Sequence, residues 1–355
     1  MIEPDTFAFH VTYTCPLSCA HCCFGSSPEL KDSLDPSFIL GTIDEIPDYI
    51  KLVAFTGGEP FLHGNNLVKY VARAVSRGFV TRIVTSAYFG KTPAIARKKL
   101  APLVDAGLKE LSISWDDFHE EFVAFSCVKN VVHAALAANL RVAINIVQTG
   151  ASRWNKELVH QQLEIADPTR VKVMESPINL TGRAAKKLTD QPLRQVGYVG
   201  PCSFVLTGPT LSAKGNLMPC CGVIPNTERL TIAKAPKTHE IPQLIQSSLA
   251  NPLFLWLHLR GPYAIMEWIS EKYGIAIPPR EEVGGICEAC KLLFETPALD
   301  DKLDEVLQER AAMLEGELML LESLFKLQQY DTTYLWADKS RITNRHGELS
   351  ELEVG

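Results

Sequence analysis

The chain has 355 residues, with 35 Lys and Arg against 41 Asp and Glu and a net charge of −6. This length can bury a large core and accommodates one barrel plus a smaller second unit. The charged residues lack the basic excess that is typical of nucleic-acid-binding proteins, so we expect no nucleic acid partner. No apolar run is as long as a membrane span, and the N-terminus lacks a signal-peptide pattern, so we expect neither a membrane partner nor secretion.

The first 180 residues alternate strand and helix patterns, which predicts a parallel sheet wrapped by helices. The sequence predicts six βα units, too few for a closed eight-fold barrel. We therefore expect an α/β fold with a partial (β/α)6 TIM-like barrel, whose chemistry belongs at the C-terminal ends of the strands. The predicted strands are 7–13, 51–55, 81–85, 110–115, 141–147 and 170–174, with helices over 67–75, 93–106 and 122–132.

After Pro201 the pattern changes. A hairpin is predicted over 204–218, with its turn at Lys214-Gly215-Asn216. A loop over 225–242, an apolar helical stretch over 252–273, and a charged amphipathic helix or helix pair over 299–329 follow. The expected domains are the barrel (1–185), a small hairpin-plus-helix unit (186–296), a C-terminal helical segment (297–337) and a polar tail (338–355).

Ten cysteines without a secretion signal favour the reducing cytoplasm, where clustered thiols are more often metal ligands than disulfides. Cys127 stands alone in a helical pattern and is expected to be a small buried hydrophobe. The other nine are clustered, which points to metal binding. They are Cys15, Cys19, Cys22 and Cys23; Cys202, Cys220 and Cys221; and Cys287 and Cys290.

The first group forms a C-x3-C-x2-C loop directly after the first predicted strand. Thiolates from Cys15, Cys19 and Cys22 can each hold one iron of a cubane cluster, which leaves the fourth iron open to bind and activate a substrate. The alternative is a zinc knuckle with His21 or Cys23 as the fourth ligand. Zinc modules normally pair two such knuckles, and no second knuckle lies within the next hundred residues.

A second motif, Gly57-Gly58-Glu59-Pro60, follows the second predicted strand. Adjacent glycines and a proline are typical of a tight turn in any protein. Here the run comes 35 residues after Cys22, at the same predicted face of the barrel. Glycine allows the backbone to approach a ligand closely, and a carboxylate suits an ammonium group.

Together the two motifs resemble the signature of the radical S-adenosylmethionine (radical SAM) superfamily. The resemblance covers about the first 180 residues. It implies a [4Fe-4S] cluster on the cysteine loop and S-adenosylmethionine bound through its methionyl amino group by Gly57–Pro60. The reduced cluster would give one electron to S-adenosylmethionine, producing methionine and a 5′-deoxyadenosyl radical that abstracts a substrate hydrogen. His21 stands where the family often has an aromatic residue, and it could pack over the cluster or the adenine.

Further cofactor contacts are implied by the same resemblance. Family members often contact the ribose at the end of the fourth strand, where Ser114 and Asp116 are the candidates; Asp116 could equally be a helix cap. Asn145 in the fifth strand is another candidate, and its alternative role is to satisfy a neighbouring polar group. The run Gly182-Arg183-Ala184 is similar to family members that modify peptides. Arg183 could bind a carboxylate or be a solvated surface residue.

The second cysteine set is similar to the shortened SPASM or "twitch" extension, which binds one auxiliary [4Fe-4S] cluster. Cys202 and Cys220 flank the hairpin, and Cys287-x2-Cys290 completes four sulfur ligands. The longer SPASM pattern needs further cysteines after Cys290, and the sequence has none. A structural zinc site on the same four residues is the alternative. Cys221 could replace Cys220 as the ligand.

These observations predict a cytoplasmic radical SAM enzyme whose auxiliary cluster takes up the electron left after hydrogen abstraction. The favoured substrate is a ribosomally made peptide that is crosslinked, epimerised or oxidised. The alternative is a dehydrogenase acting on an aminocyclitol or sugar alcohol, and the alternative of another class is a non-catalytic two-cluster electron-transfer protein. The expected electron donor is a flavodoxin or ferredoxin. Only fourteen residues precede Cys15, so a leader-peptide-binding partner would be a separate protein. The sequence singles out no catalytic acid or base.

Overall fold

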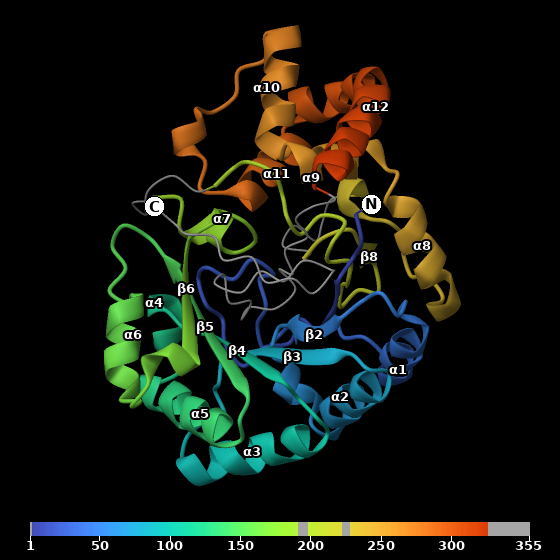
Figure 1. Cartoon of the computed structure of the whole chain (residues 1–355). Helices are drawn as coiled ribbons and strands as arrows, with labels where there is room; N and C mark the ends of the chain where they lie inside the picture. Colours follow the sequence, from blue (N-terminus) through green and yellow to red (C-terminus); the bar gives the residue numbers. More distant parts are fainter. Residues whose placement is uncertain (1, 191–197, 222–227, 326–355) are drawn as a thin grey trace.

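The computed structural model describes residues 2–190, 198–221 and 228–325. Its centre is an eight-stranded sheet with the order β6-β5-β4-β3-β2-β1-β7-β8. The first six strands are all parallel and neighbour one another in chain order, so they curve into a partial barrel, as predicted (Figure 1). They are β1 (Thr6–Thr12), β2 (Leu52–Gly57), β3 (Val80–Thr85), β4 (Glu110–Ser114), β5 (Arg141–Gln148) and β6 (Val171–Pro177).

Helices cover the outer face of this sheet (Figure 1). Three of the covering helices start at side-chain caps: the side chains of Asp35, Thr92 and Asn155 accept hydrogen bonds from the first turns of α1, α3 and α6. Of these helices, α1 and α6 were not predicted from the sequence. The covering helices are α1 (Pro36–Glu45), α2 (Asn65–Ser76), α3 (Pro93–Asp105), α5 (Phe125–Ala137) and α6 (Lys156–Leu163); α4 (Asp117–Glu120) is a single turn after β4.

The predicted hairpin exists, but its strands are only two residues long: β7 (Thr210–Leu211) and β8 (Leu217–Met218). Its turn is at the predicted place, where Gly215 has a φ of 82°. The sequence did not indicate that β7 pairs in parallel with β1, with Ala8 opposite Thr210. The hairpin therefore extends the barrel sheet and brings the segment that follows it to the edge of the barrel.

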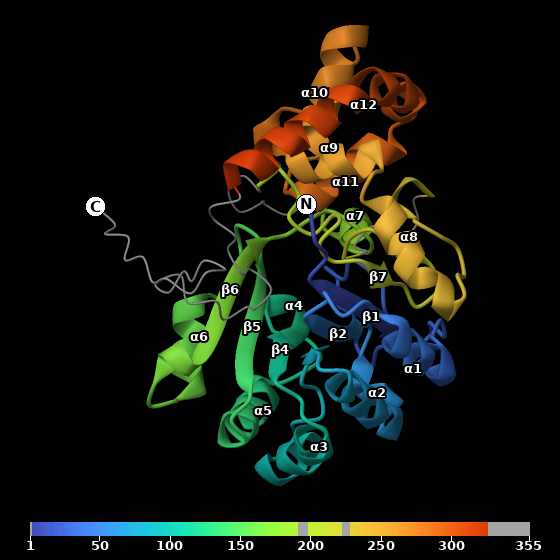
Figure 2. The same ribbon diagram turned by 45° about the vertical axis from the view of Figure 1, so that its right-hand side comes forward.

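A helical lobe completes the chain at one end of the barrel (Figures 1 and 2). The predicted apolar stretch over 252–273 is two helices, because Gly261 has a φ of 84° and its backbone lies against the Gly200 carbonyl. The predicted segment over 299–329 is a single helix as far as Phe325; residues 326–337 and the tail 338–355 lie outside the described residues. The lobe consists of α9 (Pro252–Leu259), α10 (Pro262–Tyr273), α11 (Ile286–Glu295) and α12 (Pro297–Phe325). Two further helices lie outside it: α7 (Ala184–Lys187) follows β6, and α8 (Ile241–Ser248) packs against the barrel core. The 3-10 turns in the described part of the chain are Pro60–His63, Pro168–Arg170, Glu228–Leu230, Thr238–Glu240 and Arg280–Glu282.

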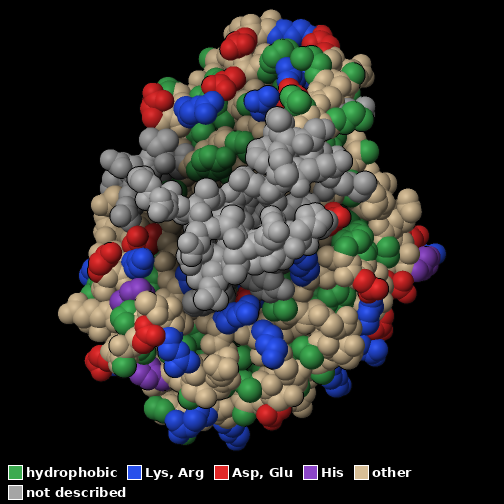
Figure 3. Space-filling view, in the orientation of Figure 1, with side chains coloured by type: hydrophobic (Ala, Val, Ile, Leu, Met, Phe, Trp, Pro, Cys, Tyr) green, Lys and Arg blue, Asp and Glu red, His purple; other side chains and the backbone are tan. Residues whose placement is uncertain are grey.

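The buried apolar side chains form a large barrel core and a second core inside the lobe. In the lobe, the Arg310 guanidinium lies over the rings of Trp256 and Trp268, 5.1 and 4.4 Å from their centroids. Lys, Arg, Asp and Glu side chains are interspersed on the face seen in Figure 3. Among the described residues, no helix combines the length and apolar character needed to cross a bilayer.

Candidate active site

A cavity of about 330 Å³ lies at the C-terminal ends of the six parallel strands. Every one of these strands, or the loop after it, contributes to its wall. The cavity thus lies at the face of the barrel where we expect the chemistry. Its lining includes Cys15, Cys19, Cys22, Gly57, Gly58, Thr85, Ser86, Ser114, Val147, Ser176, Asn179 and Thr181.

The three cysteines of the first loop all line this cavity as free thiols. Cys15 and Cys19 are buried, with 9% and 5% exposure. Burial raises the pKa of Cys15 to about 12 and also raises the pKa of Cys19. A cation bound here would offset this cost, because metals ligate thiolates and displace their protons. The donor set therefore fits a thiolate-bound iron cluster.

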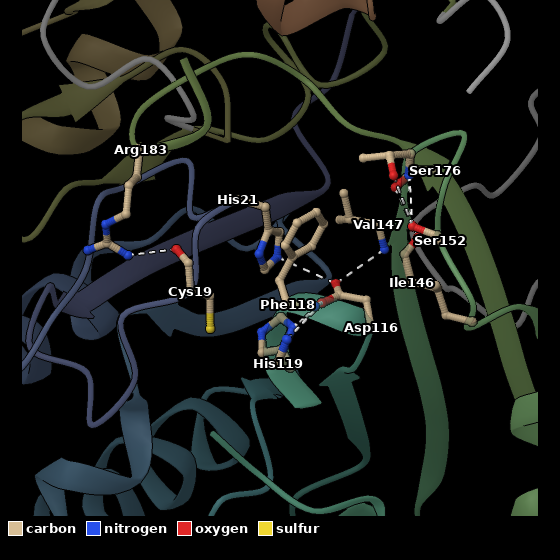
Figure 4. Close-up of polar contacts among 11 residues, drawn as sticks. Cys19, His21, Asp116, Phe118, His119, Ile146, Val147, Ser152, Ser176 and Arg183 are labelled. Carbon is tan, nitrogen blue, oxygen red and sulfur yellow. Dashed lines mark hydrogen bonds and ion pairs between the residues drawn. The ribbon is translucent and has the colours of Figure 1, made fainter. Parts of the chain in front are cut away.

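Arg183 clamps the cysteine loop. Its guanidinium donates to the carbonyls of Cys19, Gly25 and Ser26 at 2.7, 2.6 and 2.7 Å (Figure 4 shows the first). The backbone N–H of Arg183 also donates to the Cys22 carbonyl at 3.0 Å. In the structure the half-buried Arg183 holds the loop that carries the thiols, a role that was not considered from the sequence. A contact between Arg183 and a carboxylate stays a prediction.

The glycine next to Arg183 makes the clamp possible. Gly182 has a φ of +52°, and a Cβ there would lie 2.0 Å from the Cys23 carbonyl oxygen. Only glycine therefore allows the segment after β6 to lie on the cysteine loop.

The two glycines of the second motif pack against the start of the cysteine loop. A Cβ on Gly57 would lie 2.4 Å from the Thr12 carbonyl oxygen, and one on Gly58 would lie 2.2 Å from that of Thr14. Gly58 and Glu59 donate backbone hydrogen bonds to these same two carbonyls, at 2.6 and 3.0 Å. Close approach is indeed the reason for the glycines. The partner that the structure shows is the chain itself, and both glycines still line the cavity.

Glu59 is fully buried and accepts five hydrogen bonds from its own chain. The hydroxyl of Thr85 donates to both carboxylate oxygens, the backbone and hydroxyl of Ser86 donate to Oε2, and the Phe61 backbone donates to Oε1. Burial raises the pKa of Glu59, although these hydrogen bonds act in the opposite direction. Glu59 thus fixes Thr85 and Ser86, which line the cavity. Its contact with a methionyl amino group stays a prediction.

Asp116 caps α4, one of the two roles considered from the sequence. Its Oδ1 accepts from the backbone N–H groups of Phe118 and His119, and its Oδ2 accepts from Val147 (Figure 4). Burial would raise the pKa of Asp116, but the neighbouring His119 and His21 outweigh burial and lower it to about 2. Asp116 therefore stays ionised beneath the cavity wall. A ribose contact by this residue stays a prediction.

The other two predicted ribose and cofactor residues lie in different settings. Ser114 lines the cavity at the end of β4. The Asn145 side chain donates to the Ser112 hydroxyl at 2.7 Å, which is the alternative role considered for it. A cofactor contact by Ser114 or Asn145 stays a prediction.

Four buried polar atoms of the cavity wall have no hydrogen-bond partner within the described part of the chain. They are His21 Nδ1, Ser26 Oγ, Asn179 Oδ1 and Thr181 Oγ1. Unpaired buried polar groups are costly, so these atoms indicate a cavity built for a polar ligand. Among them, Asn179 and Thr181 follow β6, where the sequence gave no motif to select them.

The second cysteine set is assembled next to the first. Cys287 and Cys290 lie near the start of α11, and Cys287 also lines the barrel cavity. A hydrogen bond with Cys221 and burial raise the pKa of Cys287. Burial, together with nearby Cys221, raises the pKa values of Cys202 and Cys290. Cys221 hydrogen-bonds with Cys287 and Cys220 also lies near it, so the ambiguity between them persists in three dimensions.

Glu288 joins the two cysteine regions, and the sequence analysis missed it. This residue lies between Cys287 and Cys290 on α11, and its Oε2 accepts from the Leu180 backbone at 3.0 Å. Leu180 is three residues before Arg183, which clamps the first loop. We call residues 178–183 the strap, because Leu180 contacts the second cysteine region and Arg183 contacts the first.

The family model described as "Radical SAM superfamily" matches residues 9–148 of the chain. The match covers the cysteine loop, the glycine motif and strands β2 to β5. The chain contains a radical SAM domain. The resemblance drawn from the two motifs is therefore confirmed.

The similarity to one curated protein extends beyond the radical SAM domain. YydG of Bacillus subtilis (strain 168), whose name assigns it to peptide biosynthesis, is 22% identical over 302 residues, covering 82% of this chain and 92% of YydG. PqqA peptide cyclase of Rhodopseudomonas palustris (strain ATCC BAA-98 / CGA009) is 30% identical over 122 residues, covering 32% of this chain and 29% of the cyclase. The chain therefore contains a radical SAM domain and is similar to YydG over most of both lengths.

Solved structures with a similar arrangement were also found. They include anSMEcpe with bound AdoMet and Cp18Cys peptide (11% identity, TM-score 0.47, 86% of this chain and 100% of that one). BtrN in complex with AdoMet and 2-DOIA is 16% identical (TM-score 0.42, 68% of this chain and 82% of that one). SuiB of Streptococcus suis bound to precursor peptide SuiA is 11% identical (TM-score 0.41, 68% of this chain and 65% of that one). All three TM-scores are below 0.5, so these likenesses carry no weight for function.

Proposed function

We propose that this protein is a radical SAM enzyme that modifies a peptide, with a second iron–sulfur cluster that takes up an electron from the substrate. One observation carries the proposal: the first cysteine loop and Cys287 of the second set line one and the same cavity. A substrate in that cavity would touch both regions. A carrier of two clusters would have no need for such a shared space.

In this proposal, Cys15, Cys19 and Cys22 hold the first [4Fe-4S] cluster. When bound, the cluster and S-adenosylmethionine supply the radical chemistry. The chain's own part is to position and enclose them. Arg183 fixes the loop, and Glu59 fixes Thr85 and Ser86 at the cavity wall. The unpaired hydroxyls and amide oxygen of the wall are free to bind the polar parts of the cofactor.

The hydrogen bonds already made to Glu59 bear on how the methionyl amino group of S-adenosylmethionine is bound. Five hydrogen bonds from Phe61, Thr85 and Ser86 leave the carboxylate little capacity for an ammonium. We propose that backbone carbonyls around Gly57 and Gly58 make the direct contacts and that Glu59 supports them with its negative charge.

The auxiliary cluster would be held by Cys202, Cys220, Cys287 and Cys290, with Cys221 as the alternative to Cys220. A fully ligated cluster passes electrons and does not bind a substrate. Its place beside the cavity suits an acceptor for the electron that remains after hydrogen abstraction. Relatedness to YydG, whose name refers to peptide biosynthesis, supports a peptide as the substrate.

Anaerobic reconstitution of the whole chain tests this function. We expect the reduced protein to convert S-adenosylmethionine to 5′-deoxyadenosine, and a peptide substrate to show a mass change or deuterium exchange at a single residue. Candidate peptides are those encoded next to the gene. Turnover of an aminocyclitol or sugar alcohol in place of any peptide would overturn the substrate assignment and leave the radical chemistry intact.

A further inference from the structure

A compact group of three potential metal ligands lies beside the cavity: Cys19, His21 and His119. One ligand atom from each residue lies within 4.8 Å of the other two. Cys19 and His119 are buried, and His21 is nearly so. Figure 4 shows the Cys19 sulfur and the two imidazole rings facing the same space. Cys19 belongs to the cysteine loop, but His119 lies a hundred residues later, on α4, so the fold alone brings the three together.

The hydrogen bonds around the group leave one nitrogen of each histidine for a ligand. His119 Nδ1 lies 2.8 Å from Asp116 Oδ1. An ionised carboxylate can only accept, so His119 Nδ1 carries the proton and its Nε2 has a free lone pair. His21 Nε2 lies 3.5 Å from Asp116 Oδ2, whereas its Nδ1 is buried without a hydrogen-bond partner in the described part of the chain.

This is the carboxylate–histidine pattern that orients zinc-ligating imidazoles. Phe118, stacked on the His21 ring at 4.8 Å between centroids, holds that ring further in place. Tetrahedral Zn²⁺ with about 2.1 Å bonds to nitrogen and about 2.3 Å bonds to sulfur needs ligand atoms roughly 3.5 Å apart. A contraction of up to about 1.3 Å, through side-chain rotation, would meet that requirement.

We propose that the protein without its first cluster binds one Zn²⁺ through Cys19, His21 and His119, with Asp116 as the orienting carboxylate and the fourth position open to the cavity. On binding, the Cys19 thiol loses its proton to solvent and becomes a thiolate ligand. Imidazole and thiolate ligands together suit zinc well.

Zinc at this site and the iron–sulfur cluster exclude each other, because both require Cys19. Zinc would thus hold the protein in an inactive form that must lose its metal before the cluster can be inserted. The inference concerns the apo-protein and does not depend on the proposed function: zinc binding can be measured whether or not the chain performs radical chemistry.

The test uses the full-length chain with Cys202, Cys287 and Cys290 changed to Ser, so that the second cysteine set does not bind metal. The apo-protein is titrated anaerobically with Zn²⁺ against a chromophoric chelator, and with Co²⁺ as a spectroscopic substitute. We expect one metal per chain, visible bands typical of four-coordinate Co²⁺, and a thiolate charge-transfer band with the intensity of a single sulfur ligand.

Substitutions distinguish this site from a zinc knuckle on the cysteine loop. Asp116→Asn should lower the affinity for Zn²⁺ by roughly 10–100-fold, the loss typical of a residue that orients a ligand. His119→Gln removes a ligand and should lower the affinity at least as much. Cys15→Ser should leave affinity nearly unchanged, and His239→Gln on the exposed 3-10 turn serves as the matched control. His119→Gln should still take up iron during reconstitution, which shows that it folds.

Two results would overturn the proposal. One is Zn²⁺ affinity that is unaffected by His119→Gln but lost in Cys15→Ser, which would put the metal on the three thiols. The other is a charge-transfer band with the intensity of three sulfur ligands. A parent protein that forms no cluster even without zinc would count against the proposed function and would leave the zinc result standing.

Discussion

At the scale of single residues, the site depends on side chains that form hydrogen bonds within the chain itself. The Arg183 guanidinium donates to three loop carbonyls, and the Glu59 carboxylate accepts from four donor groups. Both residues would look like ligand-binding groups in a sequence motif. Their contacts show that they fix the loops which line the cavity.

Replacing Arg183 by Met should weaken the first cluster site. Three carbonyls would lose a charged donor, at roughly 1.5 kcal/mol or more for each hydrogen bond. We expect faster loss of iron from the cysteine loop to a chelator, measured in the variant that lacks the second cysteine set. The exposed Arg153, which pairs with Glu120 on the surface, provides the control: Arg153→Met should retain iron like the parent. Equal iron retention in both variants would contradict the clamp.

Replacing Glu59 by Gln should destabilise the fold. An amide nitrogen would face the donor groups of Thr85 and Ser86, leaving at least one buried donor unpaired at a cost of about 1–3 kcal/mol. The measurement is the free energy of unfolding in urea, with the exposed Glu271→Gln as the matched control. If Glu59→Gln were as stable as that control, the hydrogen bonds to Glu59 would not be structural.

At the scale of elements, β1 connects the barrel to the second cysteine region through His10. The buried His10 Nε2 donates to the Cys221 carbonyl at 3.1 Å, so the Tyr13 hydroxyl donates to His10 Nδ1 at 3.2 Å. Both bonds are satisfied by the neutral ring. Burial lowers the pKa of His10 to about 4, although the neighbouring Cys221 acts in the opposite direction.

This lowered pKa predicts a pH-dependent stability. An unfolded histidine has a pKa of about 6.5, so between about pH 6.5 and 4 the unfolded chain binds a proton that the folded chain does not. His10 therefore stabilises the fold above about pH 6.5, and that contribution, up to about 3 kcal/mol, is lost as the pH falls toward 4. Urea unfolding of His10→Gln and the parent across this range should show a flatter pH dependence in the variant. If the free energy of unfolding changed with pH equally in the variant and the parent, the contribution of His10 would be refuted.

The elements also show how far the sequence could lead. Alternating apolar residues and turn signals were enough for the six parallel strands, because each strand is defined by local patterns such as Phe7, Phe9 and Val11. The pairing of β7 with β1 joins residues about two hundred positions apart, and no local pattern encodes it. The helices α1 and α6 were missed although Asp35 and Asn155 are ordinary N-caps.

The residues of the site likewise include some that the sequence could predict and some that it could not. Spacing was sufficient to select the cysteines and the glycine motif. The cavity lining includes the three loop cysteines, Cys287 of the second set, and Gly57 and Gly58 of the motif. His119 and Glu288 could not be selected, because their roles depend on neighbours that only the fold brings near: Cys19 and His21 for the first, Leu180 for the second.

At the scale of the whole molecule, the strap over 178–183 joins the two cysteine regions, and one cavity touches both. The proposed function therefore requires two clusters in each chain. Reconstitution should yield roughly eight irons per chain for two cubanes.

The fourth ligand of the second cluster can be identified by comparing two variants. By the spacing of the motif, Cys220→Ser should lower the iron content toward roughly four per chain, and Cys221→Ser should retain roughly eight. The two cysteines are adjacent, and both variants replace a sulfur by an oxygen, so each variant is the control for the other. The reverse result would assign Cys221, the neighbour of Cys287, as the ligand. Zinc in place of iron at this set would remove its role in electron uptake.

The central claim is that Cys15, Cys19 and Cys22 hold a cluster that cleaves S-adenosylmethionine. Its most direct test is the amount of 5′-deoxyadenosine released by the reduced, reconstituted protein. We expect release from the parent and from the variant lacking Cys202, Cys287 and Cys290, and none when any of the three loop cysteines is Ala. Absence of 5′-deoxyadenosine from a parent that carries its full iron, or its release without the loop cysteines, would contradict the account.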